Sequence, residues 1–532
     1  MNKIATYLNE HLSGEVFTHA KNLDDLSADG SVLGNRPEMV AKVANVNDIR
    51  KIMRFCSQLA EKGHVLPVTV RGDGTDTTGS ATTSGLVIDV SSRLNHVIGL
   101  DPRQKLIHIQ SGMRYSAVNA ILSTHRGLGL ANISEFGLDG TLGGAIGSGA
   151  DGSRVGVRLS PMDSIKQVEV VLSNGDILQT DRLSKRDLAR KKGLTTLEGE
   201  IYRKVDNLIT DNKETIAKLK KMNLGTTGYS NITKVKAKDG SFNLAPLFVG
   251  SQGTLGIISE VILQAGFIKP DLTVVISAYE NMTDAQSAID LTVGSKASAV
   301  NLIDGRVFAE AAKQGKKVSW APEPTHSGAV VMAIFDDFSE RTRARLAKSI
   351  QKKLKSTNPQ HTEVKKIDTA SLSELYSAIA VASRPSNTGE EVPGVFSGMW
   401  LPVAQLDIFI NELRQLEEMF GVAIPIFYDA TTEYLDLFPV FDLKKVSNRQ
   451  NLLKILAELA NMIDRLGGSL AGRGGDGKLK SFANTKVLDK DILDLFQQIR
   501  VIFDPHSILN TGVKQEVPVK ELVAQINYHC RA

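Results

Sequence analysis

The amino-acid sequence predicts an α+β fold with more than one domain, and three observations carry this prediction. The chain has 532 residues, a length typical of two to four domains with large cores. Its first half contains short apolar runs separated by glycine-rich turns, a pattern typical of short strands. From about residue 270 onward, longer strand-like runs alternate with helical patterns, which indicates a sheet covered by helices.

The first half is expected to begin with a wrapping segment, residues 1–35, before a domain over residues 36–268. An amphipathic helix is predicted over residues 47–60, with Asn47 capping its start and Gly63 ending it. A second helix is predicted around residues 116–122, and strands are predicted at residues 65–70, 86–90, 106–110, 165–172 and 177–180. The last two strands flank the hairpin signal Ser173-Asn174-Gly175-Asp176.

A charged segment, residues 181–222, is predicted to be a helical insertion with solvated faces. At residues 247–258 a strand is expected to enter a glycine turn, and Pro270 marks the end of the domain. A second domain is expected over residues 269–480, followed by a helical segment, residues 481–532, that returns to the first. The predicted elements of the second domain are strands at 272–279 and 329–335 and helices at 340–354, 404–419 and 449–466.

Charge and cysteine content exclude several classes of function. Lys and Arg number 63 and Asp and Glu 59, which gives no reason to expect a nucleic-acid partner. Two cysteines are too few for a disulfide framework or a cysteine-based metal site, and Cys56 is expected in the core. Since no apolar run has the length of a membrane span and the N-terminus shows no signal-peptide pattern, we expect a cytoplasmic protein, with a peripheral membrane contact left open.

The stretch from Val68 to Gly79 is the most informative one. An apolar strand runs into a turn of glycines and hydroxyl side chains, and a second strand follows at residues 86–90. Small side chains let backbone N–H groups approach an anion, usually a phosphate or pyrophosphate. One such loop can also be an ordinary hairpin turn. A dinucleotide site of the Rossmann type would need a helix after the loop, where this sequence predicts a strand.

Two further glycine-rich stretches accompany this loop. Residues 141–152 contain a Gly-x-Gly-x-x-Gly pattern at 147–152, but no apolar helix follows it and no acidic residue stands at the spacing of an NAD site. The third stretch is the turn at residues 250–258. Three such loops in one strand-rich domain favour a shared site for a phosphate and a ring over three unrelated turns, and they exclude NAD.

Five motifs in this order resemble those of the vanillyl-alcohol-oxidase type (PCMH-type) FAD-binding flavoproteins, and within them the branch of D-lactate, glycolate and D-2-hydroxyglutarate dehydrogenases. They are Arg71–Thr75, Gly85–Ser91, Thr141–Gly144, Gly250–Ile257 and Phe503–Lys514. The resemblance is dense from about residue 35 to 265, clear from 426 to 514 and weak between. It implies a PCMH-type FAD-binding domain of two subdomains and an α+β cap domain that carries the substrate site.

The resemblance also implies where FAD is held. Residues 71–79 would bind the pyrophosphate, and residues 141–152 would lie along the adenosine, ribityl and flavin portion. Ile258 would meet the adenine end, and Asn510 would approach the isoalloxazine. The implied cofactor-binding residues are Arg71, Gly72, Asp73, Gly74, Thr75, Asp76, Thr77, Thr78, Gly79, Thr141, Gly143, Gly144, Ser148, Gly149, Gly152, Ile258 and Asn510. Non-covalent FAD is expected, since these loops contain no His and neither Cys56 nor Cys530 lies in a motif.

Two residues of these loops depart from the family. Asp76 stands where relatives carry a small neutral residue, and Gln252 replaces a common Glu. A carboxylate beside a pyrophosphate would be repulsive unless it turns outward or accepts a backbone N–H. We expect Asp76 to turn outward.

The family's metal-binding positions are also changed. The branch carries two His in a Gly-His-x-Gly-Asp-Gly-Asn-x-His strand, and these positions are Asp429 and Asp436 here. Its Gly-Glu-His-Gly segment has Arg473 in place of Glu and Gly474 in place of His. We expect no metal but an ion-paired cluster of the two Asp with Arg473, with an oxygen-only Mg or Mn site as the alternative. Strand alternation would put the two Asp on opposite faces, so a bulge or bend is expected between them.

Four residues are candidates for the catalytic role. Arg384 could clamp a carboxylate with two hydrogen bonds, although it could equally be a surface arginine. Tyr428, Tyr434 and Lys478 are polar side chains expected near the flavin. A tyrosine can act as acid or base when nearby cations lower its pKa.

The implied function is an FAD-dependent oxidoreductase that oxidises a D-lactate-like 2-hydroxy acid by hydride transfer to flavin N5. Electrons would pass to an acceptor other than NAD, such as a quinone, a cytochrome or an electron-transfer flavoprotein. The alternatives are an oxidase, a non-redox enzyme like the alkyl-glycerone-phosphate synthases, and a non-catalytic flavin-binding subunit.

Overall fold

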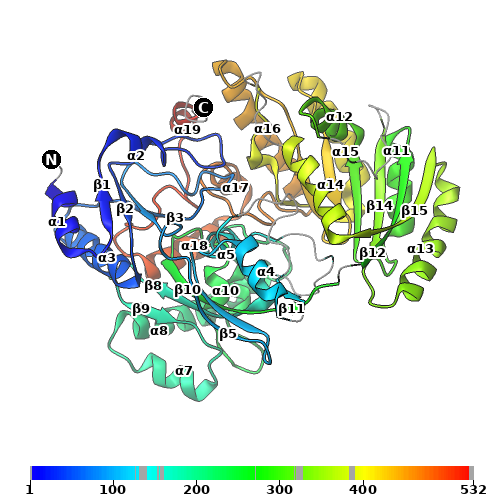
Figure 1. Ribbon diagram of the computed structural model, residues 1–532. Coiled ribbons are helices and arrows are strands. Elements are labelled where there is room, and N and C mark those ends of the chain that lie inside the picture. The colour runs from blue at the N-terminus through cyan, green and yellow to red at the C-terminus, as the bar shows by residue number, and fades with distance from the viewer. Residues whose placement is uncertain are drawn as a thin grey trace.

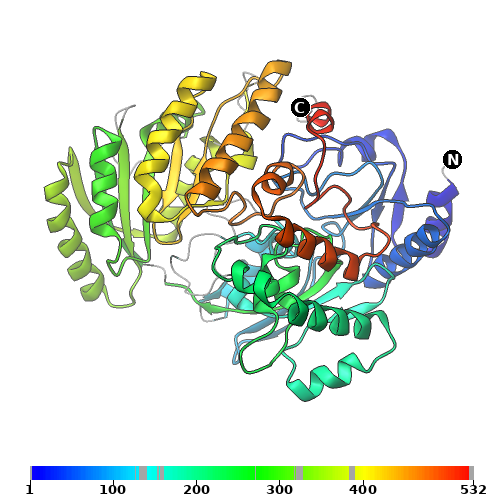
Figure 2. The ribbon, with the colours of Figure 1, turned by 180° about the vertical axis from the view of Figure 1, so that it is seen from behind.

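The computed structural model describes residues 3–125, 127–130, 140–151, 155, 161–269, 271–316, 318, 328–382 and 390–526. Figures 1 and 2 show two lobes: the first contains the chain up to about residue 268, and the second contains the chain from residue 271 to the end of α16 (Val446–Arg465). The last helices return to the first lobe. The mixture of helices and sheets confirms the predicted α+β class. Pro270, the expected boundary, lies outside the described residues.

The first lobe begins with a four-stranded sheet. Its strands are β1 (Glu15–Phe17), β2 (Met39–Lys42), β4 (Leu86–Asp89) and β3 (Val68–Arg71), in that spatial order. β3 and β4 are parallel, so the glycine-rich loop between them is not a hairpin turn. Helix α3 (Val46–Glu61) packs on this sheet through a stripe that includes Cys56. Asn45, and not the predicted Asn47 two residues later, caps the helix by accepting the N–H of Asp48.

The second sheet of this lobe has five antiparallel strands. They are β5 (Val97–Asp101), β6 (Leu106–Gln110), β10 (Ile257–Gln264), β8 (Ile165–Val171) and β9 (Ile177–Gln179), in that order. The predicted hairpin of β8 and β9 is confirmed. The strand expected at residue 247 is wrong, because α10 (Ala245–Phe248) occupies that position. Pro246 at the start of this short helix favours a helical first turn.

The charged segment 181–222 is helical, as predicted. It forms α7 (Lys185–Lys192), α8 (Leu197–Asp211) and α9 (Lys213–Leu219). Its faces are not all solvated, because α8 buries Ile201, Tyr202 and Val205 in the core of the second sheet, where it also contacts α18 (Lys490–Phe503).

The second lobe is built on a seven-stranded antiparallel sheet. Its strands are β15 (His361–Asp368), β12 (Asp271–Tyr279), β14 (Ala329–Phe335), β13 (Ala299–Asp304), β17 (Ile426–Asp429), β18 (Tyr434–Leu437) and β16 (Met399–Trp400), in that order. Helices α11 (Met282–Thr292), α13 (Glu340–Leu354), α15 (Leu406–Phe420) and α16 cover one face, and α12 (Gly305–Lys313) and α14 (Thr369–Ala382) cover the other. All five elements predicted here are present within three residues of the expected ends.

The C-terminal part lies against the first lobe (Figure 2). After α17 (Ser481–Val487) and α18, the chain runs beside β3, where Val68 exchanges backbone hydrogen bonds with Ile508 and Asn510. The remaining elements are α1 (Lys3–His11), α2 (Ala20–Asp24), α4 (Tyr115–Ser123), β7 (Leu128–Gly129), α5 (Leu142–Ser148), α6 (Pro161–Ser164), β11 (Gly266–Phe267), α19 (Val519–Gln525) and the short 3-10 turns Ser230–Lys234, Lys355–Thr357, Gly394–Phe396 and Val403–Gln405.

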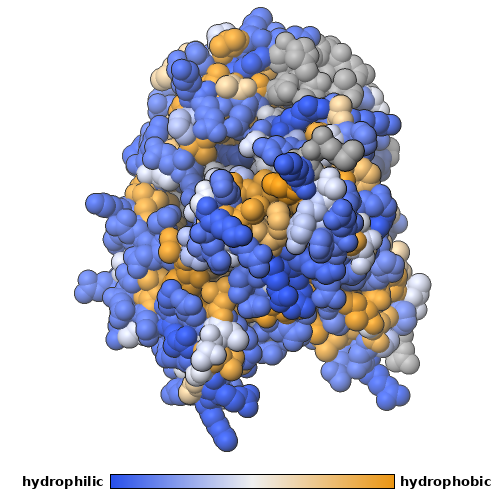
Figure 3. Space-filling view, turned by 90° about the vertical axis from the view of Figure 1, so that its left-hand side faces the viewer, coloured by the Kyte–Doolittle hydropathy of each residue, from blue (hydrophilic) through white to orange (hydrophobic). Residues whose placement is uncertain are grey.

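The face of the molecule in Figure 3 carries scattered rather than continuous apolar residues. On the face shown in Figure 3, hydrophilic residues cover most of the area and apolar residues form separate groups. Within the described ranges, no helix combines the length and hydropathy needed to cross a bilayer.

Candidate active site

A cavity of about 620 Å³ is lined by both lobes. One side, which we call the loop wall, is formed by residues from the three glycine-rich stretches 70–81, 140–151 and 252–258. Gly79, a predicted cofactor-binding residue, does not line the cavity and packs against Leu33 instead. The other side, the cap wall, consists of Val392, Gly394, Ser397, Gly398, Asp436, Arg473, Gly474 and Lys480. Segments that lie far apart in the sequence, such as those of Val70 and Lys480, therefore enclose one space.

The loops of the loop wall fit together at distances that only glycine allows. A Cβ atom added to Gly72 would lie 2.1 Å from Thr141 Oγ1, and one on Gly74 would lie 2.2 Å from Arg71 Nη2. Gly74 also has a φ of +70°, a backbone conformation that favours glycine. Gly72 is therefore required for packing between two loops, and Gly74 for packing of the Arg71 side chain within its own loop.

Arg71 is the buried cation of the loop wall. Its side chain lines the cavity, and its Nε and Nη1 atoms have no hydrogen-bond partner. Burial lowers its pKa, while Asp29, Asp89 and Asp73 oppose this shift. Buried polar groups are rarely left unpaired, so the guanidinium fits an anionic group of a ligand in this cavity. A pyrophosphate meets this requirement, and the residues present fit FAD.

Helix α5 forms within the second glycine-rich stretch, where no helix was predicted. Thr141 caps it by accepting the N–H of Gly144 at 3.2 Å, and Gly149 ends it in the left-handed conformation. Of the predicted residues, Thr141, Gly143, Gly144 and Ser148 line the cavity. Gly149 packs instead against Thr226 and Gly250, and Gly152 lies outside the described residues.

The preferred outward orientation of Asp76 is wrong. Its Oδ1 accepts the backbone N–H groups of Thr78 at 2.8 Å and of Ser80 at 3.0 Å. Gln252 completes the arrangement, because its Nε2 donates to Asp76 Oδ2 at 3.3 Å and to Thr78 Oγ1 at 3.0 Å. A glutamate at position 252 would instead place two carboxylates together. The two residues expected to depart from the family are therefore in contact with each other.

Asn510 lies behind the loop wall and does not line the cavity, contrary to the prediction. Its side chain donates to Ser80 O at 2.8 Å and to Gln252 O at 2.6 Å, and it accepts from Thr69 at 2.9 Å. It therefore fixes two of the loops relative to β3. Ile258, the second residue of β10, does line the cavity, as do Gln252, Gly253 and Gly256 of the turn before it.

On the cap wall, Asp436 and Arg473 form the predicted ion pair. Arg473 Nη2 lies 2.7 Å from Asp436 Oδ2, and both side chains are buried. Asp436 Oδ1 accepts the N–H of Gly398 at 2.6 Å, while Arg473 Nη1 donates to Asp151 O at 2.8 Å. Both oxygens of Asp436 are thus occupied by protein donors.

Asp429 does not join this pair. A hairpin turn between β17 and β18, rather than a bulge, reverses the chain, and the register Asp429↔Tyr434 and Phe427↔Asp436 places both Asp on one face of the sheet. Asp429 accepts the N–H of Thr431 at 2.9 Å, lies outside the cavity lining, and burial raises its pKa. Among the residues that the structure describes, no group of three or more His, Cys, Asp or Glu side chains could hold a metal.

The catalytic candidates occupy other places than expected. Tyr428 is buried in the cap core and donates to Leu401 O at 2.8 Å, and burial raises its pKa. Lys478 donates to Thr82 O at 2.6 Å. Neither lines the cavity, so the prediction that they face the ligand is wrong. Tyr434 stacks under Arg473, with the guanidinium carbon 4.7 Å from its ring centre. Arg384 lies outside the described residues.

Lys480 is the cap-wall residue that the sequence analysis missed. It lines the cavity, its side chain is buried, and its Nζ donates to Ser397 O at 2.6 Å. The signal in the sequence was a pair of lysines two positions apart, Lys478 and Lys480, just before α17. Both lysines are buried, and only the fold shows that Lys480 lines the cavity while Lys478 does not.

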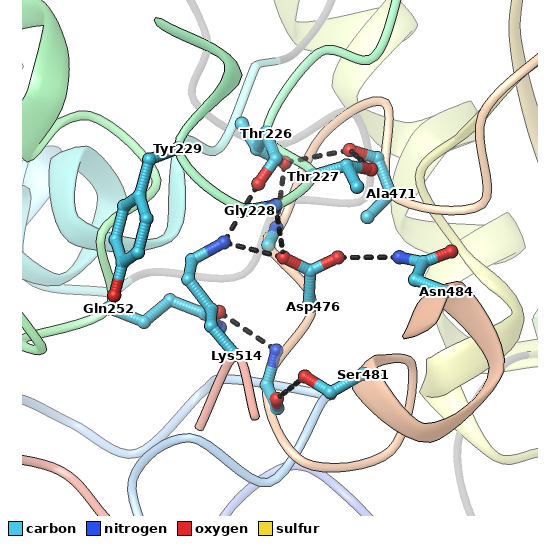
Figure 4. Close-up of polar contacts among 12 residues, drawn as sticks. Thr226, Thr227, Gly228, Tyr229, Gln252, Ala471, Asp476, Ser481, Asn484 and Lys514 are labelled. Carbon is cyan, nitrogen blue, oxygen red and sulfur yellow. Dashed lines mark hydrogen bonds and ion pairs between the residues drawn. The ribbon is translucent and has the colours of Figure 1, made fainter. Parts of the chain in front are cut away.

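A buried network holds the segment that carries Arg473 and Lys480. Figure 4 shows Asp476 between Lys514 and Asn484, and the Asp476–Lys514 ion pair measures 2.6 Å. Asp476 Oδ2 also accepts the N–H of Gly228 at 2.7 Å. The segment is therefore tied to Gly228 of the first lobe and to the C-terminal return, which fixes the cap wall against the first lobe.

Comparisons with known proteins agree with this architecture. Residues 37–181 match the family model described as FAD binding domain, and residues 269–513 match FAD linked oxidases, C-terminal domain. The chain is 23% identical over 95% of its length to a D-2-hydroxyglutarate dehydrogenase of Pseudomonas putida and spans about half (51%) of that relative. It is also 23% identical to "Glycolate oxidase subunit GlcD" of Bacillus subtilis, over 90% of this chain and 88% of the relative.

Two solved structures share the fold at low identity. A 4-ethylphenol oxidase of Gulosibacter chungangensis aligns with a TM-score of 0.68 at 13% identity, covering 97% of both chains. An alkyldihydroxyacetonephosphate synthase aligns with a TM-score of 0.61 at 12% identity, covering 96% of this chain and 86% of the other.

Proposed function

We propose that this chain, which matches the FAD binding domain and the C-terminal domain of FAD linked oxidases, is an FAD-linked oxidoreductase acting on a D-lactate-like 2-hydroxy acid. One observation carries the proposal: a single cavity joins the glycine loops of the FAD-binding domain to buried cations of the cap wall. Such a site can hold a cofactor's phosphates on one side and an anionic substrate on the other. The names of the relatives refer to hydroxy acids of this kind.

The loop wall would bind FAD without a covalent bond. Arg71 would pair with the pyrophosphate, and the glycines at positions 72 and 74 would let the backbone approach it. FAD, when bound, supplies the acceptor for a hydride from the substrate carbon. The residues of the cap wall would position the substrate against it and exclude water.

Arg473 would take over the charge that a metal provides in the related dehydrogenases. A guanidinium stays protonated at physiological pH, and Asp436 and the Tyr434 ring hold it in one orientation. The substrate carboxylate or hydroxyl would then be bound without a metal, and EDTA would leave the reaction unaffected.

The electron acceptor is proposed to be a quinone, a cytochrome or an electron-transfer flavoprotein rather than NAD. The parallel strands around the 71–79 loop are not those of an NAD site, which places a helix after its loop. A cytoplasmic location with a peripheral membrane contact stays a prediction.

Anaerobic mixing tests the proposed function directly. The purified protein should be yellow, release its flavin in acid, and lose absorbance near 450 nm when mixed with a D-2-hydroxy acid such as D-lactate, D-malate or D-2-hydroxyglutarate. Bleaching by none of these acids, in a protein with full FAD, would contradict the proposal and favour an oxidase of another substrate, a non-redox enzyme or a non-catalytic flavin-binding subunit.

A further inference from the structure

Lys480 is a buried cation on the cap wall without an assigned role. Its Nζ lies 2.6 Å from the carbonyl oxygen of Ser397, the single acceptor it contacts among the described residues. Its backbone N–H donates to Asp476 O at 2.9 Å, at the point where α17 begins. The side chain therefore extends from a fixed position into the cavity, with two of its N–H donors free for a ligand.

The charges around Lys480 come from three segments. Asp476 of its own segment, Asp436 of β18 and Asp76 of the loop wall favour the protonated amine, and Arg473 opposes it. Burial is the largest influence, and together these effects lower the pKa of Lys480 to about 8. At pH 7 about a tenth of such an amine is unprotonated, a far larger share than for an exposed lysine.

We infer that Lys480 is the catalytic base of the proposed oxidation, replacing the histidine and metal of the related dehydrogenases. The inference rests on the proposed function. The neutral Nζ takes the proton of the substrate hydroxyl, so an O–H bond breaks and an N–H bond forms. The hydrogen on C2 leaves with both bonding electrons to the cofactor, and the C–O bond becomes a carbonyl. The products are a 2-oxo acid, a cofactor reduced by two electrons, and a lysine ammonium that returns its proton to water.

No other described group on the cap wall fits this role. Arg473 stays protonated, and Asp436 is neutralised by it through a 2.7 Å ion pair. Asp29 also lines the cavity, but it lies beside the 71–81 loop, where its carboxylate accepts the N–H groups of Ser31 and Ala81. Lys480 is thus the titratable side chain of the cap wall whose proton is free to move.

The test compares Lys480→Met with Lys478→Met, a matched buried lysine that does not line the cavity. Both variants are first checked for FAD content and melting temperature. In the wild type, the second-order rate constant of flavin bleaching by the substrate should rise with pH. It should reach a plateau at pH values above an apparent pKa near 8. Lys480→Met should bleach at least about 100-fold more slowly and lose this pH dependence. Lys478→Met should keep it.

Two further measurements separate a base from a structural residue. Added ethylamine should restore part of the bleaching rate of Lys480→Ala and none of the rate of Lys478→Ala. In protein without substrate, reductive ¹³C-methylation should give a methylamine resonance that titrates near pH 8 in the wild type and is absent from Lys480→Met. Equal bleaching rates for Lys480→Met and wild type would overturn the inference and leave the proposed function intact. A wild type that no hydroxy acid bleaches would overturn both, whatever the titration of Lys480.

Discussion

The loop wall and the cap wall of the cavity are built by different means. The loop wall is made largely of backbone and glycine around the Arg71 side chain, with Gly72 so close to Thr141, and Gly74 so close to Arg71, that a Cβ at either glycine would clash. The cap wall presents buried charges, Asp436, Arg473 and Lys480. A backbone-built site depends on few side-chain identities, whereas a charge-built site changes with each substitution. The comparison fits a chain that matches the FAD binding domain while carrying Asp436 and Arg473 on the cap wall.

The largest effect is expected where the loop wall is most tightly packed. Gly72→Ala places a Cβ 2.1 Å from Thr141 Oγ1, so one of the two loops must move. We expect the protein to be purified with little or no FAD, measured by the ratio of absorbance at 450 and 280 nm. Gly99→Ala is the control, since a Cβ there meets no atom within 4 Å. Full flavin content in Gly72→Ala would show that the loops are not closely coupled.

The next effect concerns the ion pair of the cap wall. Asp436→Asn leaves the buried charge of Arg473 without its partner, which typically costs about 3 kcal/mol of unfolding free energy. FAD content should remain, because the loop wall is unchanged. Glu412→Gln, which breaks the exposed pair with Arg465, should leave the free energy of unfolding nearly unchanged in the same urea titration. Equal losses in both variants would mean that burial of the Asp436 pair has no energetic consequence.

A third, smaller effect tests the contact between Asp76 and Gln252. Gln252→Glu places a second carboxylate beside Asp76 and should weaken FAD binding, measured by fluorescence titration of the apoprotein. Asp76→Asn added to Gln252→Glu should restore part of the affinity, with a coupling energy of about 1 kcal/mol. If the effects of the two substitutions on FAD affinity are additive, the contact between Asp76 and Gln252 does not contribute to FAD binding.

The smallest effect is a pH dependence of the loop wall. Burial, followed by the nearby Asp76, raises the pKa of Asp29 to about 6. Because neutral Asp29 no longer repels a pyrophosphate, FAD should bind more tightly as pH falls from 7 to 5. The folded apoprotein holds this proton more firmly than the unfolded chain, so its stability should decrease as pH rises from about 4 to 6. Asp29→Asn should remove the pH dependence of FAD affinity and that of apoprotein stability. An unchanged pH profile in this variant would contradict the assignment of these two effects to Asp29.

The sequence predicts the loop wall better than the cap wall, for a physical reason. Glycine patterns report backbone geometry directly, and the loops that they predicted line one cavity. Which charged side chain enters the cavity depends on a contact distant in sequence, such as that of Lys480 with Ser397. The sequence could therefore not separate Lys478 from Lys480, nor place Asp76 against Gln252. The Asp436–Arg473 pair was predictable because Arg473 occupies a position where the resemblance implies a metal ligand, so a nearby carboxylate was expected to pair with it.

The central claim is that the chain has kept the family's cofactor site and replaces its metal with buried cations of its own. Anaerobic stopped-flow bleaching by D-2-hydroxy acids after exhaustive dialysis against EDTA tests it most directly. We predict full and rapid bleaching that added Zn²⁺, Mn²⁺ or Mg²⁺ does not accelerate. Bleaching that disappears with EDTA and returns with a divalent metal would contradict the claim.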